Sequence, residues 1–193
     1  MPPGAKFTRE EIIEAALEII RIDGISGLTA RTLGARLGSS ARPIFTVFQS
    51  MDEVQQAAID AAKKVYLGYV ERGLAEELAF KGVGTQYILF AIEEPKLFQL
   101  LFMKEQEKIP DLSGVLPIID ESYERILASV QDGYGMDRDM AQRLYQHLWI
   151  YTHGIASLCA TRMCRFTGQQ ISEMMTEVCI SLLKNMKAGM KND

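Results

Sequence analysis

Apolar side chains recur every three or four residues along almost the whole chain, which is the spacing of a helix that buries one face. Capping boxes, in which a Ser or Thr is followed three residues later by Glu or Gln, mark three helix starts. No alternation of apolar and polar positions is long enough for a strand, so the pattern predicts an all-α protein. The predicted helices cover about 8–23, 29–36, 39–48, 51–79, 84–92, a stretch from 95, 117–131, 138–163 and 168–187, with capping boxes at Thr8, Ser50 and Thr167 and a loop at 109–117.

The chain divides in this pattern into two parts. Residues 1–50 hold three short helices and predict an N-terminal helix-turn-helix domain. Residues 51–193 hold the longer helices and predict a C-terminal helical domain, with 51–79 as the linking helix. Gly82 and Gly84 are expected to separate that linking helix from the rest.

Residues 29–48 have the order of a helix-turn-helix: a short helix, a glycine turn and a second short helix. Gly38 is expected to take the positive φ of the turn, and small residues at the start of 39–48 would let that helix approach base edges. We call residues 39–48 the recognition segment. The same spacing also occurs at ordinary corners between helices. The predicted DNA-binding residues, which supply hydroxyls, cations or close backbone approach, are Thr29, Arg31, Thr32, Ser39, Ser40, Ala41, Arg42, Pro43, Phe45, Thr46 and Lys63.

Charge changes this picture in one place. The net charge is -4 and the isoelectric point is near 5.3, which argues against a protein that coats nucleic acid. Between Gly24 and Ser50, however, the chain carries three arginines and no carboxylate. A confined basic strip on an acidic protein favours a local phosphate contact while the remaining surface is repelled from DNA.

The first 55 residues resemble the N-terminal domain of the tetracycline-repressor (TetR) family of bacterial regulators. The family often has tyrosine where this chain has Phe45 and lysine where it has Met51, so two phosphate contacts are missing here. The resemblance implies a DNA-binding regulator whose C-terminal helices bind a small effector and form a homodimer. The matching runs are IIEAAL at 12–17, GISGLT at 24–29, LGARLGSS at 33–40 and PIFTVF at 43–48.

The C-terminal helices fit this implication. Helix 138–163 has two apolar stripes and helix 168–187 has one, so two copies could form a four-helix interface, although the core of a monomer would show the same pattern. His153 is expected more often to be hydrogen-bonded in a core than to sense a ligand or pH. The candidate effector-binding residues, mostly aromatic or apolar, are Tyr87, Phe90, Phe98, Phe102, Met103, Tyr123, Leu127, Trp149 and His153.

Other chemistry finds little support in the sequence. No nucleophile motif, phosphate loop or metal-ligand spacing is present, so no catalytic residue, metal or cofactor is expected. The N-terminus has no secretory signal and no apolar run is long enough to cross a membrane, which predicts a cytoplasmic protein. Three cysteines are too few for a disulfide scaffold, and Cys159 and Cys164, expected five apart on one helix, would point different ways.

The sequence therefore predicts a ligand-responsive transcriptional regulator, a homodimeric repressor released from a palindromic double-stranded DNA operator by a small apolar effector. Two alternatives stay open. One is a helical interaction or ligand-binding module that has lost DNA binding, and the other is a helical enzyme.

Overall fold

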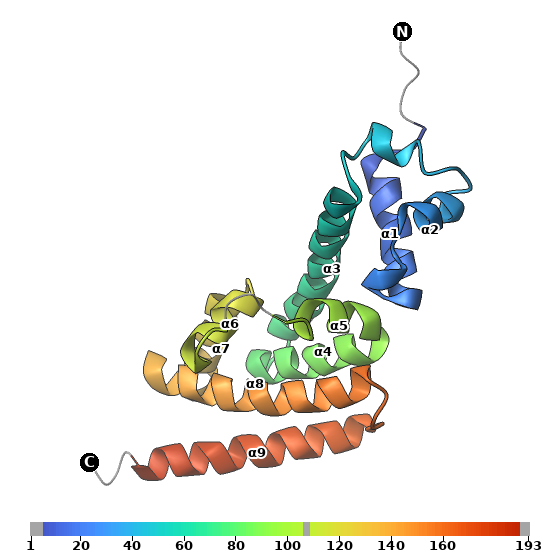
Figure 1. Cartoon of the computed structure of the whole chain (residues 1–193). Helices are drawn as coiled ribbons and strands as arrows, with labels where there is room; N and C mark the ends of the chain where they lie inside the picture. The colour runs from blue at the N-terminus through green and yellow to red at the C-terminus, as the bar shows by residue number, and fades with distance from the viewer. Residues whose placement is uncertain (1–5, 106–108, 190–193) are drawn as a thin grey trace. The chain divides into compact units, whose positions relative to one another are not determined.

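The computed structural model describes residues 6–105 and 109–189, and the described chain is all-α, as predicted (Figure 1). It forms two compact units. The first comprises residues up to 66 together with 94–104, and the second comprises 67–93 with the residues from 105 onward. The elements in chain order are α1 Arg9–Asp23, η1 Ile25–Gly27, α2 Ala30–Arg36, η2 Ile44–Thr46, α3 Met51–Leu74, α4 Ala79–Glu93, α5 Pro95–Phe102, α6 Leu112–Ile119, α7 Tyr123–Tyr134, α8 Arg138–Ala160 and α9 Gly168–Gly189.

The first unit is built around α1. The predicted capping box is present, since Thr8 Oγ1 accepts from the Glu11 N–H at 3.1 Å and Glu11 Oε2 accepts from the Thr8 N–H at 2.7 Å. Helix α1 packs against α2 and α5, and Arg21 pairs with Glu94 at 2.9 Å just before α5. The fully buried side chains that fill this unit are Ile12, Ile20, Leu33, Ile44, Phe48, Val54, Leu97 and Phe98.

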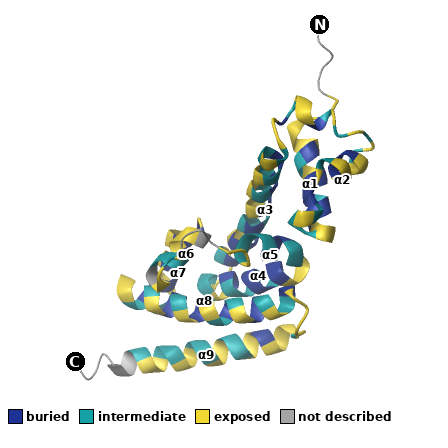
Figure 2. Cartoon of the chain, in the orientation of Figure 1, coloured by how far each residue is buried: buried dark blue, intermediate teal, exposed yellow. Residues whose placement is uncertain are grey.

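The second unit is a bundle around α4 and α8. Helix α7 packs against both of these helices, and α9 runs alongside α8 (Figure 1). The third predicted capping box opens α9, where Thr167 and Gln170 exchange backbone-to-side-chain bonds of 2.9 and 3.2 Å. Figure 2 shows exposed positions along α9, while much of α4 is buried.

The predicted break at Gly82 and Gly84 is wrong, because both glycines lie inside α4. Helix α3 ends at Leu74 and a four-residue turn leads to α4. A Cβ on Gly82 would lie 2.4 Å from the Gly73 carbonyl oxygen, and a Cβ on Gly73 would lie 2.6 Å from the Val83 Cα. The two glycines therefore let α3 and α4 cross with their backbones in contact.

The predicted loop at 109–117 and helix at 117–131 are also wrong. Helix α6 starts after Asp111, whose Oδ1 accepts from the Gly114 N–H at 2.8 Å, and it contains Pro117. A proline removes one helical hydrogen bond and does not forbid a short helix with a good cap. The chain then breaks at Asp120, whose side chain accepts from the Ser122 N–H at 2.8 Å and so competes with helix continuation.

Substitution of Gly82 by alanine is expected to destabilise the protein. The added methyl has no room between α3 and α4, and overpacking of this kind costs about 1–3 kcal/mol. Urea denaturation followed by circular dichroism measures the loss. Gly133→Ala in α7 is the matched control, because a Cβ there meets nothing within 4 Å, and it should leave stability unchanged or raise it by up to about 1 kcal/mol. Equal stability of the two variants would contradict the backbone contact.

Candidate nucleic-acid interface

The turn after α2 holds the recognition segment close to that helix. Gly38 has φ +62°, as predicted for the turn. The Ser39 N–H donates to the Gly34 carbonyl at 2.9 Å. A Cβ on Gly34 would lie 2.9 Å from the Ser40 carbonyl carbon and 3.0 Å from the Ala41 nitrogen. Position 34 therefore has to be glycine for the chain to return this closely onto α2.

The recognition segment is not the α-helix predicted for 39–48. Its only regular element is the three-residue 3₁₀ helix η2, Ile44–Thr46. Pro43 has no N–H to offer, and the Thr46 hydroxyl donates to the Pro43 carbonyl at 2.6 Å, a side-chain bond that competes with a regular helix. Ile44 and Phe48 are buried, so they fix the segment on its support as predicted.

Arg9 connects the end of the recognition segment to two helices. Its guanidinium lies 4.2 Å from the centre of the Phe48 ring, and its Nη1 lies 2.9 Å from Glu53 Oε1. Glu53 Oε2 also accepts from the Gln49 N–H at 2.7 Å. These contacts, which we call the Arg9 clasp, join the first turn of α1 to the first turn of α3 across residues 48 and 49.

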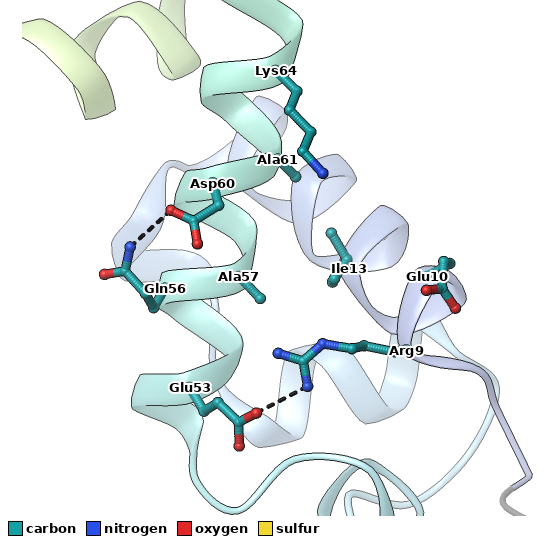
Figure 3. Close-up of a pocket in the computed structure, with 9 residues that line it drawn as sticks. All are labelled: Arg9, Glu10, Ile13, Glu53, Gln56, Ala57, Asp60, Ala61 and Lys64. Atoms are coloured by element: carbon teal, nitrogen blue, oxygen red, sulfur yellow. Dashed lines mark hydrogen bonds and ion pairs between the residues drawn. The ribbon is translucent and has the colours of Figure 1, made fainter. Parts of the chain in front are cut away.

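The clasp closes one end of an open groove of about 400 Å³ between α1 and α3 (Figure 3). Ala57, Ala61 and Ile13 form an apolar floor, and charged side chains stand along both rims. The sequence analysis assigned Glu53 only to a capping box and gave Arg9 no role. The capping prediction is half right, because Ser50 Oγ accepts from the Glu53 N–H at 3.2 Å while the Glu53 carboxylate accepts from Gln49.

The Glu53 carboxyl has a lowered pKa. The main cause is the hydrogen bond from the Gln49 backbone, and the hydrogen bond and charge of Arg9 add to it. Both contacts favour the ionised carboxylate, so they are strongest when Glu53 carries its charge.

The cations predicted to meet DNA lie on the surface of the first unit. Arg31 and Arg42 are exposed, and neither forms an ion pair within the part of the chain that the structure describes. Arg36, in contrast, pairs with Glu18. Lys63 is exposed on α3.

The predicted hydroxyl and small contacts are only partly available. The Thr32 hydroxyl donates to the Gly27 carbonyl at 2.7 Å, and Thr29 Oγ1 accepts from the Thr32 N–H at 3.2 Å. Both threonines therefore cap α2, and a phosphate contact from Thr32 would have to replace an existing bond. Ser39 Oγ accepts from Lys6 Nζ at 3.0 Å. Among the other predicted contacts, Ser40, Phe45 and Thr46 are exposed, whereas Ala41 and Pro43 are half-buried.

Three of the candidate effector residues meet in the second unit. The Tyr87 hydroxyl and His153 Nδ1 are 2.9 Å apart, and the rings of Trp149 and His153 stack with centres 5.2 Å apart. Burial raises the pKa of the Tyr87 phenol and lowers that of His153, so both side chains are neutral near pH 7. His153 is hydrogen-bonded in a half-buried position, which is the role expected of it more often than that of a sensor.

The remaining effector candidates are distributed between the units. Tyr123 stacks on Tyr145 at 5.8 Å, and Phe90 and Leu127 are fully buried in the core of the second unit. Phe98, Phe102 and Met103 belong to the first unit, where Phe102 packs edge-on against Tyr66 at 4.9 Å.

Other site types are not found in the described residues. There, no group of three or more His, Cys, Asp or Glu side chains could hold a metal ion. No helix in residues 6–105 or 109–189 is long and apolar enough to cross a membrane. Comparison of the sequence with protein-family models and with curated proteins found no match.

Substitution of Gly34 by alanine should displace residues 39–41 from α2. The new methyl would press on backbone atoms that cannot rotate away, so we expect a loss of about 1–3 kcal/mol in urea denaturation. Protease cleavage within the recognition segment should accelerate as well. The matched control is Gly68→Ala in α3, where a Cβ meets nothing within 4 Å. A Gly34→Ala protein with the stability and cleavage rate of that control would show that the close approach is not needed.

Glu53 should make the stability of the protein depend on pH. Because its pKa in the folded protein is lowered from the ordinary 4.5, the stabilisation is present above pH 4.5 and is lost as pH falls through the lowered value. Glu53→Gln should therefore unfold at a lower temperature than the natural chain at pH 7, and the difference should shrink as the solution is acidified towards pH 3.

Glu10→Gln is the control for this experiment. It removes a carboxylate from the same groove, but Glu10 makes no hydrogen bond or ion pair with the described part of the chain. If both variants lower the midpoint temperature equally at every pH, the clasp does not stabilise the unit.

Proposed function

We propose that this chain is a ligand-responsive DNA-binding transcriptional regulator, as the resemblance of its first 55 residues to the TetR family implies. The observation that carries the proposal is the joint placement of α2, the Gly38 turn and the recognition segment on an acid-free stretch of chain. A regulator of this kind would work in the cytoplasm on double-stranded DNA.

The surface chemistry of the first unit supports DNA as the partner. Exposed Arg31 and Arg42 stand on either side of the turn, and the Arg9 clasp with buried Phe48 holds the recognition segment from behind. Unpaired surface arginines can donate to phosphate oxygens or to guanine. The acidic remainder of the protein would keep other surfaces off the duplex.

We propose a homodimer assembled through α8 and α9. Along α8, Ile150 is 50% exposed and Leu158 is 36% exposed, eight residues apart and therefore on one side of the helix, with exposed Gly154 between them. Ile180 on α9 is 46% exposed. Apolar side chains of this size in solvent are a feature that a second copy of the chain would remove.

The effector in this proposal is a small, mostly apolar molecule bound in the second unit near Tyr87, Trp149 and His153. Binding would favour one of two conformations of the dimer, and the favoured conformation would hold the two recognition segments at the wrong spacing for a palindromic operator. Repression with release by ligand is the corresponding regulation.

One alternative has a specific observation behind it. Phe45 is 44% exposed at a position where a phosphate-binding hydroxyl is common in the family, and the recognition segment is not a regular helix. These two features favour a helical interaction module that has lost DNA binding. Binding to duplex DNA that weakens with salt would separate the regulator from this module.

Arg42→Ala provides the test of the regulator. Duplexes are selected from a random pool with the natural protein, and the affinity is measured at several salt concentrations. We expect the variant to bind with a loss of about 1–3 kcal/mol, or to reduce the salt slope by about 1 if Arg42 contacts phosphate. Arg143→Ala, an exposed arginine on α8, should change neither quantity.

Light scattering on the same preparation should give the mass of two chains. Failure to select any duplex at low ionic strength would refute DNA binding, and equal effects of the two arginine substitutions would refute the assigned interface.

A further inference from the structure

The chain does not leave α8 in the way its sequence pattern predicts. Helix α8 ends at Ala160, and Arg162 takes φ +58°. The Arg162 N–H donates to the Cys159 carbonyl and the Met163 N–H donates to the Leu158 carbonyl, both at 3.0 Å. This is the Schellman arrangement that closes a helix end, here with an arginine at the left-handed position that glycine usually occupies.

The turn brings two cysteines together. The Cys164 N–H also donates to the Leu158 carbonyl, at 3.2 Å. That oxygen belongs to the peptide joined to Cys159, so standard backbone dimensions keep the Cα atoms of Cys159 and Cys164 within about 7 Å of each other. A disulfide spans up to about that distance. The expectation that these cysteines share a helix and point apart is therefore wrong, because the helix ends between them.

The surroundings differ for the two thiols. Cys164 is exposed in the connection to α9, between the exposed side chains of Arg162 and Arg165 (Figure 1). Cys159 is half-buried at the end of α8. Burial raises the pKa of the Cys159 thiol, and the negative charge of a Cys164 thiolate raises it further, as expected for two sulfur atoms that are close together.

We propose that Cys159 and Cys164 are a reversible redox pair that closes a disulfide across the end of α8. The exposed Cys164 thiolate attacks a hydroperoxide, its sulfur becoming a sulfenic acid as the O–O bond breaks and water or an alcohol leaves. The Cys159 thiolate then attacks that sulfur, forms the S–S bond and expels hydroxide, which takes up a proton. One hydroperoxide is reduced by two electrons for each pair of thiols oxidised, and a dithiol reductant reverses the change.

The third cysteine serves as an internal comparison. Cys179 lies eleven residues after Gly168, the first residue of α9, so about 16 Å of helix separates it from the α8–α9 connection. Its sulfur lies 3.6 Å from the Tyr134 hydroxyl of α7. Like Cys159 it is half-buried, so exposure alone would not distinguish these two cysteines.

The experiment oxidises the full-length protein with a small excess of hydrogen peroxide, blocks the remaining thiols and digests the protein with trypsin. Cleavage after Arg143, Arg162 and Arg165 puts Cys159 and Cys164 on separate peptides, 144–162 and 163–165, and leaves Cys179 on a third. We expect the first two peptides to be recovered joined, about 2 Da lighter than their sum, with two of the three thiols lost. Reduction should restore both thiols.

Three variants sharpen the result. Cys179→Ser should form the joined peptide at the natural rate. Cys159→Ser should stop at the sulfenic acid on Cys164, which a dimedone probe detects, and Cys164→Ser should lose no thiol at the same peroxide dose. Joining of Cys179 to either partner, cross-linking between chains, or simultaneous loss of all three thiols would overturn the proposed pair. None of these readouts depends on DNA binding, so the outcome is independent of the function proposed above.

Discussion

The first unit depends on a place where no side chain fits. At Gly34 the backbone of α2 touches the backbone of the turn that follows it, and a single methyl would lie 2.9 Å from the Ser40 carbonyl carbon. Because the chain must return this closely, the exposed side chains of residues 40–46 are carried on a short segment held against α2. Ile44 and Phe48 then bury themselves beneath that segment, and Arg9 covers Phe48 from the side of α1. Packing, turn geometry and surface chemistry of this unit therefore have a common origin in the size of one residue.

Glycine pairs and polar caps also decide the second unit. The crossing of α3 over α4 requires Gly73 and Gly82, and the ends of α6, α8 and α9 are set by Asp111, Asp137 and Thr167. Between those ends the core contains the hydrogen-bonded pair of Tyr87 and His153, whose pKa shifts keep both side chains neutral. A neutral, half-buried polar pair beside an aromatic ring can orient a mostly apolar molecule without charging the core.

Local signals predicted the helices that begin on a good cap, and they failed where backbone geometry between distant residues decides. Thr8, Thr29 and Thr167 announce α1, α2 and α9 because capping involves residues only three positions apart. Gly82 looks like a helix breaker by itself, and only its contact with Gly73 explains why it lies inside α4. The recognition segment was expected to be an α-helix, since the preference of Thr46 for the Pro43 carbonyl leaves no trace in an apolar periodicity. The Arg9 clasp was missed for the same reason: its partners lie about 40 residues away along the chain.

Helix α5 has a consequence for how the protein could be taken apart. It belongs to the same compact unit as α1, to which it is tied by Arg21 and Glu94, although nearly thirty residues of the other unit precede it in the chain. A fragment truncated after residue 50 or 66 would lack buried Leu97 and Phe98 and would expose the surface they cover. The putting together of this unit must wait until residue 104 has been synthesised. Recombination could not transplant it as a contiguous cassette, as a head-to-tail domain boundary would permit.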